Sequence, residues 1–356
     1  MVKGHLVDAL DRSVIQALQL DGRILSSALA RTLDVSNRTV DRRVSLLRSM
    51  GVVRVVGALD ATALGRSQWI VRIRVVPGAA APVAQALAER PDTTWVRILA
   101  GGTDVVCMLQ ESSRATSVNA ILDTLPRASS VVDVTAQLQL HVYRRGTRSL
   151  PYLAGALSPE QFRAVEFGAV PRAGQPAAHG PRSAAASPGL DDVDRALLSV
   201  LHQDGRARLE ALAAATGTPA STVRRRVARL RASSVLRLDV EVDHRALGRP
   251  MLTHLWMAVV PGELHRAGAA LARHPEVAFA AATTGRTNLY ACVLAADAPD
   301  LHKYLIGRLA SIVPLRAVEA IPVAVHLKGA GAAGRRPRQR WPHTDQEAAV
   351  SAAKSR

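Results

Sequence analysis

The chain has 356 residues, of which 48% are hydrophobic and 21% charged, a composition typical of a globular protein with more than one compact domain. No apolar run approaches the ~20 residues that a membrane-spanning helix needs, and the first residues carry no secretory leader, so the sequence predicts a cytoplasmic protein that is not bound to a membrane. A formal net charge of +17 at pH 7 favours polyanionic partners.

Two cysteines, Cys107 and Cys292, each lie within an apolar run. Isolated cysteines without a CxxC pair or neighbouring histidines form neither a disulfide framework nor a zinc site. We therefore predict no metal and no cofactor.

The chain contains an internal repeat. Residues 10–66 align with residues 193–249 without a gap and share the segments "DGR", "ALA" and "ALGR". The arginine-rich stretch "TVDRRVSLLR" of the first copy returns as "TVRRRVARLR" in the second, and a weaker match continues through "VVPG". This period predicts two copies of a unit of roughly 140 residues.

Three helices are predicted at the start of the first copy. Asp8 caps the first helix, and the "DG" pair at 21–22 ends it. A second helix follows over 25–33, and Ser36 caps a third that ends at Gly51. Two helices joined by a tight turn in this position are typical of a DNA-binding helix-turn-helix.

The second copy repeats these helices with different caps. Thr218 takes the capping role of the third helix, and Pro219 takes its first position. Ser234 replaces the terminating glycine, which costs up to about 1 kcal/mol if the residue has a positive φ. After each third helix, segments 52–60 and 235–243 predict a short hairpin, the wing of a winged helix.

The remainder of each copy alternates strands and helices. In the first copy the predicted order is strand 69–76, helix 80–90, strands 93–100 and 105–110, helix 116–126 and strand 131–142. This βαββαβ order returns over 252–327 and predicts a ferredoxin-like antiparallel sheet with both helices on one face. The sheet of the other copy is the simplest cover for the open face.

The predicted fold class is therefore α+β, with two winged or plain helix-turn-helix domains alternating with two ferredoxin-like βαββαβ domains. The predicted boundaries are 1–66 and 67–150 for the first copy, 151–188 for a Pro/Ala/Gly-rich linker, 189–249 and 250–328 for the second copy, and 329–356 for a disordered basic tail. Within the linker, Ser158, Pro159 and Gly168 mark a helix over 157–168.

The third helices supply candidate DNA contacts. An apolar stripe of Val40, Val44 and Leu47 faces the core and leaves the opposite face to solvent. The candidates are Ser36, Asn37, Arg38, Thr39, Arg42 and Arg43 in the first copy, and Ala220, Ser221, Thr222, Arg224, Arg225 and Arg226 in the second; Asp41, Ser45 and Arg229 share the outward faces. Arginine forks suit guanine edges and phosphates.

Two alternative readings of these arginines stay open. Arg43 and Arg226 lie at the helix flank, where an acidic neighbour is an alternative partner to phosphate. An isolated charged helix face is often only solvated. Its recurrence on the same helix in both copies, together with the net charge, favours DNA binding.

In combination, "DGR", "TVxRRVxxLR", "ALG" and the turn "GGTD" resemble the leucine-responsive/AsnC (Lrp/AsnC) family of transcriptional regulators, here as two fused copies. The resemblance implies that the helix-turn-helix binds operator DNA. It also implies that the βαββαβ domain dimerises through its sheet and binds a small effector, often an amino acid, at the turn between its second and third strands.

Carried onto this sequence, the effector-binding candidates are Gly101, Thr103 and Asp104 in the first copy and Gly285, Thr287 and Asn288 in the second. Asn288 replaces the carboxylate of Asp104 that would meet an ammonium group. The two copies then have split roles, or the effector is not a simple amino acid. Glycine followed by Asn or Asp is also ordinary turn chemistry, which needs no effector.

The sequence thus predicts a sequence-specific regulator whose fused copies act as an intrachain pseudo-dimer, with double-stranded DNA and an amino acid or related metabolite as partners. Further homo-oligomerisation is expected through the βαββαβ domains. The alternatives are a tetrapyrrole decarboxylase, some of which resemble this family, and a sequence-tolerant architectural DNA-binding protein. Against an enzyme, the strands show no cluster of histidine and tyrosine, and His141 and His326 are expected to be core or edge residues.

Overall fold

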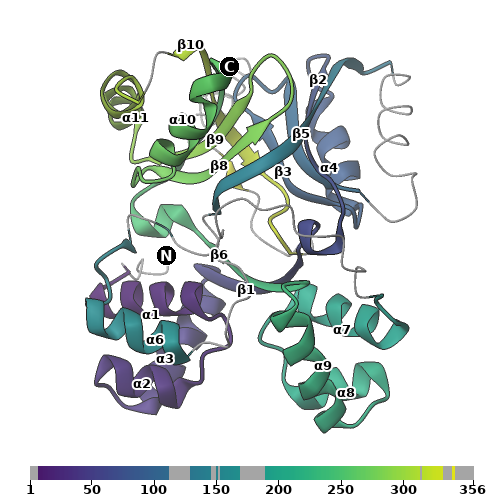
Figure 1. The fold of residues 1–356 in the computed structure, drawn as a ribbon, viewed down its shortest axis with the longest axis vertical. Coiled ribbons are helices and arrows are strands. Elements are labelled where there is room, and N and C mark those ends of the chain that lie inside the picture. Colours follow the sequence, from purple (N-terminus) through teal and green to yellow (C-terminus); the bar gives the residue numbers. More distant parts are fainter. Residues whose placement is uncertain are drawn as a thin grey trace, which may run out of the picture.

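The computed structural model describes residues 7–111, 129–145, 150, 153–168, 189–312, 315–331 and 339–340. Its elements separate into two layers (Figure 1). Two groups of helices lie at one end, and the larger sheet with the remaining helices lies at the other. Strands β1 (Val53–Leu59) and β6 (Leu236–Val242) run between the two helical groups.

The first helical unit contains α1 (Ala9–Leu20), α2 (Ser26–Leu33) and α3 (Asn37–Ser49), whose buried apolar residues recur at helical spacing. Asp8 and Asp11 exchange hydrogen bonds between side chain and backbone at the start of α1, which is a capping box. The predicted cap at Asp8 is therefore confirmed.

The second helical unit contains α7 (Asp192–Gln203), α8 (Leu209–Thr216) and α9 (Ala220–Ala232). The predicted start of α9 is wrong by one residue. Pro219 is the N-cap, where its missing N–H costs nothing, and Thr218 contacts the hydroxyl of Thr216 at 2.8 Å instead of capping α9. Ser234 has a φ of +61°, close to the +71° of Gly51, so the first copy has glycine at this left-handed position and the second does not.

The predicted wings are replaced by a different pairing. Within the described residues, segments 52–60 and 235–243 each hold one strand, β1 and β6, and no hairpin. These two strands pair antiparallel with each other, with Val56 opposite Asp239 at the centre. An extended sequence pattern predicts a strand without naming its partner, and here the partner belongs to the other copy. We call this two-stranded sheet the ribbon.

Beside the ribbon, each helical unit contacts the other through equivalent residues. Arg23 donates hydrogen bonds to two carbonyls of the loop after α7, and Arg206 donates to two carbonyls of the loop after α1. Two ion pairs repeat the exchange, Arg48 with Asp204 at 2.9 Å and Arg231 with Asp21 at 2.8 Å. Such exchange is the property of an isologous interface, realised here inside one chain.

The first half of the upper layer is a four-stranded antiparallel sheet in the order β3-β4-β2-β5. Its elements are β2 (Gln68–Val75), α4 (Ala80–Glu89), β3 (Thr93–Leu99), β4 (Asp104–Gln110) and β5 (Val131–Arg145). Helix α4 packs Ala84 and Leu87 onto Val71 and Val105 of this sheet. The helix predicted over 116–126 lies outside the described residues.

The second half follows the predicted βαββαβ order in full, with sheet order β8-β9-β7-β10. Its elements are β7 (Met251–Val259), α10 (Leu264–Leu271), β8 (Val277–Thr283), β9 (Leu289–Ala295), α11 (Ala298–Tyr304) with a wider helical turn at Leu305–Leu309, and β10 (Leu315–His326). Short 3₁₀ turns lie at Thr62–Leu64, His244–Leu247 and Pro261–Glu263.

The two sheets join at both edges. Strand β5 pairs with β8, and β10 pairs with both β7 and β3, so that eight strands close into a ring. A shared core fills the space between the sheets, with Ile70 and Met108 from one and Trp256 and Tyr290 from the other. Each sheet thus covers the open face of its partner, as predicted. Among the described residues, no helix is long and apolar enough to cross a membrane.

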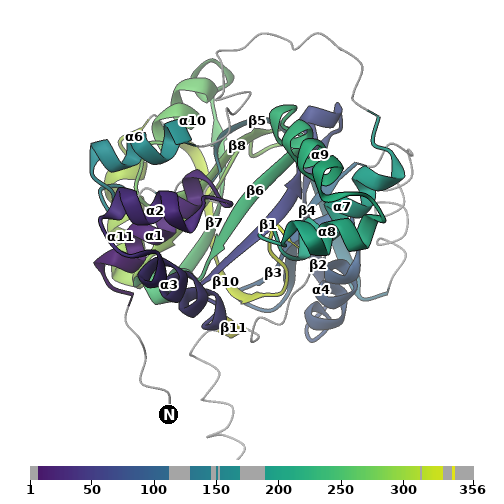
Figure 2. The same cartoon turned by 90° about the horizontal axis from the view of Figure 1, so that it is seen from below.

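Part of the predicted linker belongs to the first helical unit. Helix α6 (Pro159–Gly168) lies beside α1 and α2 (Figures 1 and 2), and the predicted helix over 157–168 is confirmed. The backbone N–H of Leu157 donates to the side chain of Gln16 at 2.7 Å. Linker residues 169–188 lie outside the described residues.

The predicted tail begins inside the molecule. Lys328 and Ala330 are buried, and the N–H of Gly331 donates to the carboxylate of Glu241 on the ribbon at 3.1 Å. A Cβ atom at Gly331 would lie 2.6 Å from the side chain of Val56 and 2.9 Å from the carbonyl oxygen of His202, so the close approach favours glycine there. The described residues 329–331 are therefore packed, which corrects the start of disorder predicted at 329; β11 (Gln339–Arg340) pairs with β10, and 341–356 lies outside the described residues.

Candidate nucleic-acid interface and ligand sites

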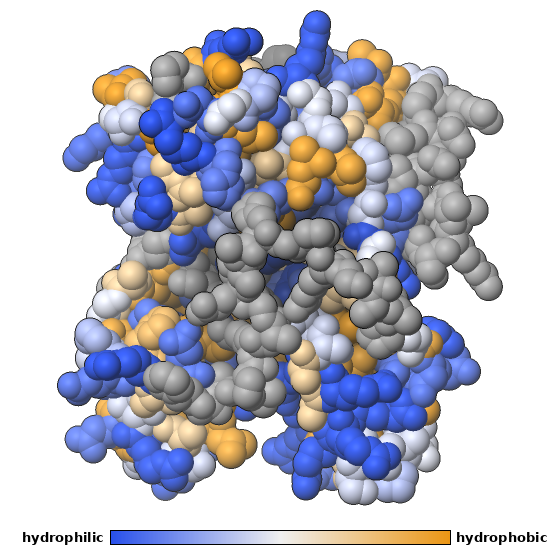
Figure 3. Space-filling view, viewed as in Figure 1, coloured by the Kyte–Doolittle hydropathy of each residue, from blue (hydrophilic) through white to orange (hydrophobic). Residues whose placement is uncertain are grey.

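The third helices of the two units, α3 and α9, lie on either side of the ribbon at the end of the molecule away from the ring (Figure 2). On α3 the residues Asn37, Arg38, Asp41, Arg42 and Ser45 are exposed, as their helical spacing predicts. On α9 the exposed set is Ala220, Ser221, Arg224, Arg225 and Arg229, while Thr39 and Thr222 are half-buried. The hydrophilic surface over the second helical unit is extensive (Figure 3). Both helices therefore present arginine to an approaching polyanion.

The cap and one exposed residue of α3 already have partners. Ser36 accepts a hydrogen bond from the backbone N–H of Thr39 at 3.1 Å, which caps the helix and aims its first turn. Ser26 of α2 donates to Asp41 at 2.5 Å. Arg224 stands at the place of Asp41 in the second copy, so the two helix faces differ in charge where they are most exposed.

Arg43 and Arg226 point into the protein. Arg43 lies 2.8 Å from Asp8 and 3.2 Å from the fully buried Asp11 of α1. Burial opposes ionisation of Asp8, but the N–H of Asp11 and the charge of Arg43 outweigh it and lower the pKa of Asp8. The sequence left either phosphate or an acidic neighbour as the partner of Arg43. The structure shows the acidic neighbour.

The same arrangement in the second unit has an additional cation. Arg226 contacts Asp191 at 2.6 Å and the buried Asp194 at 3.0 Å, and Arg229 also contacts Asp194. These ion pairs tie α9 to α7 as Arg43 ties α3 to α1. The exposed arginines of α3 and α9 that form no ion pair among the described residues are Arg38, Arg42, Arg224 and Arg225.

The first effector turn carries an internally paired carboxylate. Gly101 is exposed, and Asp104 accepts from Arg72 at 2.8 Å. Arg72 also forms two hydrogen bonds to Glu319 of β10, and its guanidinium lies 4.7 Å from the ring of Trp256. The carboxylate of Asp104, predicted to bind an ammonium group, thus already forms an ion pair with Arg72.

The second effector turn is filled from the other sheet. The side-chain amide of Gln137 on β5 donates to the carbonyl oxygens of Thr284 and Thr287, at 3.0 and 2.7 Å. Asn288 holds the backbone of Val259 with two hydrogen bonds of 2.9 Å. Gly285 has a φ of +102° and faces Gln137. The contacts of Gln137 stabilise the join between the two sheets, whereas those of Asn288 link neighbouring strands of the second sheet.

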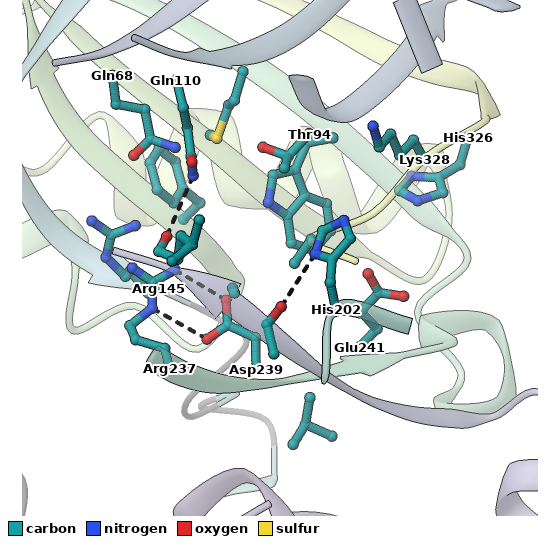
Figure 4. A pocket seen from close by; sticks show the side chains of 18 of the residues that line it. Gln68, Thr94, Gln110, Arg145, His202, Arg237, Asp239, Glu241, His326 and Lys328 are labelled. Carbon is teal, nitrogen blue, oxygen red and sulfur yellow. Dashed lines mark hydrogen bonds and ion pairs between the residues drawn. The ribbon is translucent and has the colours of Figure 1, made fainter. Parts of the chain in front are cut away.

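A cavity of about 1300 Å³ lies between the ribbon and the ring. Ribbon residues form one wall and the ends of β3, β4, β8, β9 and β10 form the other. Figure 4 shows Arg145 and Arg237 near one end, His326 and Lys328 near the other, and Thr94 between them. Arg237 is neutralised by Asp60 at 2.8 Å and by Asp239 at 3.1 Å.

A buried polar cluster adjoins this cavity, contrary to the expectation that the strands hold no histidine and tyrosine cluster. Arg97 lies 3.0 Å from Nε2 of His254, and Nδ1 of His254 lies 2.8 Å from the hydroxyl of Tyr290. Because arginine only donates, His254 Nε2 accepts and its Nδ1 carries the proton. Cys292 lies 3.5 Å from the Tyr290 hydroxyl. In the sequence, His254 and Trp256 are two residues apart, which places them on the same face of a strand. That spacing does not reveal the contacts of His254 with Arg97 and Tyr290 on other strands.

His326 and His141, the two strand histidines considered from the sequence, both contact neighbouring side chains. His326 accepts at Nδ1 from Nε of Arg97 at 3.3 Å, and His141 packs edge-on against Tyr143 at 4.6 Å. Burial raises the pKa of Cys107 to about 12, so its thiol is not a nucleophile at neutral pH.

Stability is expected to fall when the pH is lowered from about 7.5 to about 5.5, since an unfolded histidine titrates near 6.5. Burial first, then the charges of Arg97 and Arg72, hold the pKa of His254 well below that value. Burial also lowers the pKa of His202 and His274. The unfolded chain then binds more protons than the folded chain, so unfolding is favoured as acid is added.

Thermal unfolding midpoints at the two pH values measure this effect. His254→Gln is expected to flatten the dependence, whereas a substitution of the exposed His302 by Gln leaves it unchanged. An equal midpoint at both pH values in the unmodified protein would contradict the assignment of neutral buried histidines.

Two segments match models of DNA-binding domains. Residues 190–231 match the AsnC-type helix-turn-helix domain, and residues 7–54 match a winged helix-turn-helix DNA-binding domain. The two segments cover α7–α9 and α1–α3, the helices that carry the exposed arginines.

Similar curated proteins are transcriptional regulators. The HTH-type transcriptional regulator FL11 of Pyrococcus horikoshii is 29% identical over 117 residues, which cover 33% of this chain and 78% of FL11. The HTH-type transcriptional regulator AldR of Mycolicibacterium smegmatis is 29% identical over 145 residues, which cover 40% of this chain and 85% of AldR. Each relative therefore matches a length close to one copy of the unit.

One solved structure is similar over almost the whole chain. The siroheme decarboxylase NirDL aligns with 97% of this chain and 100% of its own, with a TM-score of 0.61 and 11% identity. At that identity the likeness concerns the fold. Since the helical units match DNA-binding models, one of them AsnC-type, and the similar curated proteins are named transcriptional regulators, these findings support a DNA-binding transcriptional regulator of the Lrp/AsnC type.

Proposed function

We propose that the two helical units act together as an intrachain pseudo-dimer that reads an asymmetric operator. The observation that carries this proposal is the exchange of contacts beside the ribbon, where Arg23 and Arg206 each bind the loop of the other unit. These contacts hold α3 and α9 in one arrangement without a second chain. A helix-turn-helix dimer places its two third helices in successive major grooves in this manner.

The asymmetry follows from the exposed faces. Asn37, Arg38 and Asp41 of α3 correspond to Ala220, Ser221 and Arg224 of α9. Asparagine suits an adenine edge and arginine suits a guanine edge, whereas alanine reads neither. The two half-sites of the proposed operator therefore differ in sequence.

The proposal includes an amino acid or related metabolite as effector. Its support is the difference between the turns, since Gln137 fills the second turn and the first turn stays exposed at Gly101. The predicted domain boundaries, with the packed residues 329–331 added to the second copy, and further assembly through the ring are part of the same proposal. Its place is the cytoplasm, where the DNA target lies.

Catalysis is not part of the proposed function. The ring nitrogens of His254 are both engaged, one by Arg97 and one by Tyr290, and the low pKa of His254 keeps it from acting as an acid near neutral pH. A tetrapyrrole decarboxylase is the alternative, and loss of carboxyl groups from added siroheme, detected by mass spectrometry, would establish it.

Selection of bound sequences from random double-stranded DNA tests the regulator. The expected result is a discrete motif with two unlike halves spaced by about one helical turn or a multiple of it. A palindromic motif would remove the asymmetric reading, and a uniform footprint without an enriched motif would favour the architectural alternative. DNA affinity is also expected to fall steeply with salt, with a slope of about 0.9 per phosphate neutralised.

A further inference from the structure

The cavity between the ribbon and the ring is large and basic. Its volume of about 1300 Å³ exceeds the roughly 300–1,000 Å³ of ordinary ligand pockets. Among its described lining residues, lysine and arginine outnumber aspartate and glutamate. Several of these cations form ion pairs with carboxylates, such as Arg90 with Asp92 at 2.7 Å, but two buried ones form none among the described residues.

Arg97 is the first of these two. Its side chain is on the strand β3 that borders the cavity, and only 6% of the residue is exposed. Its described partners are the neutral atoms of His254, His326 and Cys292. Within the described parts of the chain, no carboxylate forms an ion pair with it. A buried guanidinium without a counter-charge is costly, and an anion in the cavity would relieve that cost.

Lys328 is the second. It is 3% exposed, and its ammonium donates to the carbonyl oxygen of Arg90 at 2.5 Å, again with no ion pair to a carboxylate in the described residues. Burial lowers the pKa of Lys328. The charge of Asp92 partly opposes this lowering of the pKa, so Lys328 is partly compensated, whereas no described carboxylate forms an ion pair with Arg97. The backbone N–H of Lys328 donates to the carbonyl oxygen of Val96, the residue before Arg97 on β3. Lys328 therefore lies close to Arg97 along β3. Both cations approach the cavity from one side.

Trp95 forms an apolar wall beside them in an unusual backbone conformation. Its φ is +55°, a value that non-glycine residues rarely adopt, and the register of β3 against β4 shifts between Thr94 and Arg97. A bulge at this point turns the indole toward the cavity, where the guanidinium of Arg97 lies 5.0 Å from its ring. Such strain is concentrated at ligand sites, because surrounding contacts must hold it. Phe279 and Met108 extend the apolar surface.

We propose that this cavity binds an organic acid with a planar apolar body, whose acid group lies against Arg97 and Lys328 while its body packs on Trp95. This site is separate from the two effector turns. Because the ribbon forms its other wall, a bound acid would contact the element that holds α3 and α9 in place. That regulatory consequence rests on the proposed DNA-binding function, whereas the binding itself does not.

The dianionic fluorescent dye bis-ANS is a suitable probe, since it combines acid groups with flat aromatic rings. The full chain is expected to bind one dye molecule, with a fluorescence increase on titration. Arg97→Gln removes the charge but keeps a hydrogen-bond donor, and is expected to weaken dye binding by about tenfold or more. Lys328→Met is expected to weaken it in the same direction and guards against a folding defect of the Arg97 variant.

Two controls distinguish charge recognition from general loss of structure. Arg316→Gln makes the same charge change at an exposed residue of β10 and is expected to leave the dye affinity unchanged. The neutral dye Nile red is expected to bind the Arg97 variant as it binds the unmodified chain. Unchanged bis-ANS affinity in both cavity variants, or an equal loss in the Arg316 variant, would overturn the proposal. The titrations contain no DNA, so a failed DNA selection does not alter their outcome.

Discussion

Arg42→Ala and Arg225→Ala are each expected to weaken the binding of the selected operator DNA by about 1–3 kcal/mol, which is roughly 5-fold to 150-fold in affinity. Both residues are exposed, and both lie one position before an arginine that is engaged inside the protein. A guanidinium that contacts a guanine edge forms two hydrogen bonds, and alanine forms none. Electrophoretic mobility shift or fluorescence anisotropy with a labelled operator measures the change.

The two substitutions are expected to act on different halves of the site. Arg42→Ala should relax the base preference in the half bound by α3, and Arg225→Ala should relax it in the half bound by α9. Arg273→Ala removes the same charge from an exposed position after α10 and serves as the control. If Arg273→Ala lowers affinity as much as the other two, the net charge of the protein accounts for binding and the helix assignment is wrong.

Arg43→Ala is expected to lower the free energy of unfolding by about 2 kcal/mol, since it removes the counter-charge of a buried carboxylate that stays in place. The expected loss is smaller than for a fully enclosed pair, because Arg43 is 18% exposed and Asp11 keeps its hydrogen bond from Asp8. Urea unfolding followed by circular dichroism measures the change in midpoint. Arg42→Ala, one residue away, is expected to change stability by less than about 0.5 kcal/mol.

The second unit supplies an internal comparison for this prediction. Arg226→Ala should destabilise less than Arg43→Ala, because Arg229 remains in contact with Asp194. The double variant Arg226→Ala with Arg229→Ala removes both cations from Asp194 and should destabilise more than either single change. A larger loss of stability from Arg42→Ala than from Arg43→Ala would reverse the roles that we assign to neighbouring arginines.

Local patterns were sufficient for the helices. The cap at Asp8 and the helix over 157–168 depend on neighbours within a few positions, and the structure has them as predicted. The positive φ of Ser234, which the sequence left as a condition, is also present. The observed start of α9 differs from the predicted one, because either Thr218 or Pro219 could be the residue that precedes the helix. Which of them lies outside the helix depends on the packing of α8 against α9.

Long-range pairing explains what the sequence could not reveal. The segments that form β1 and β6 were recognised as extended, but the assignment of each to a local hairpin overlooked a partner in the other copy. The contact of His254 with Arg97 joins strands from different sheets, and nothing in the spacing of either residue indicates it. At the turns, Asp104 and Asn288 were recognised as different, but their partners Arg72 and Val259 lie on other strands.

The ribbon has a consequence for how the protein responds to dilution. Two separate chains that shared such a sheet would dissociate at low concentration and could exchange partners with related proteins. Here β1 and β6 belong to one polypeptide, so their pairing is governed by an effective local concentration that does not change with the amount of protein in the cell. In the proposed pseudo-dimer, joining the two DNA-binding units needs no association of chains, so this step adds no quadratic dependence of DNA occupancy on protein concentration, and neither unit is exchanged for one from another protein.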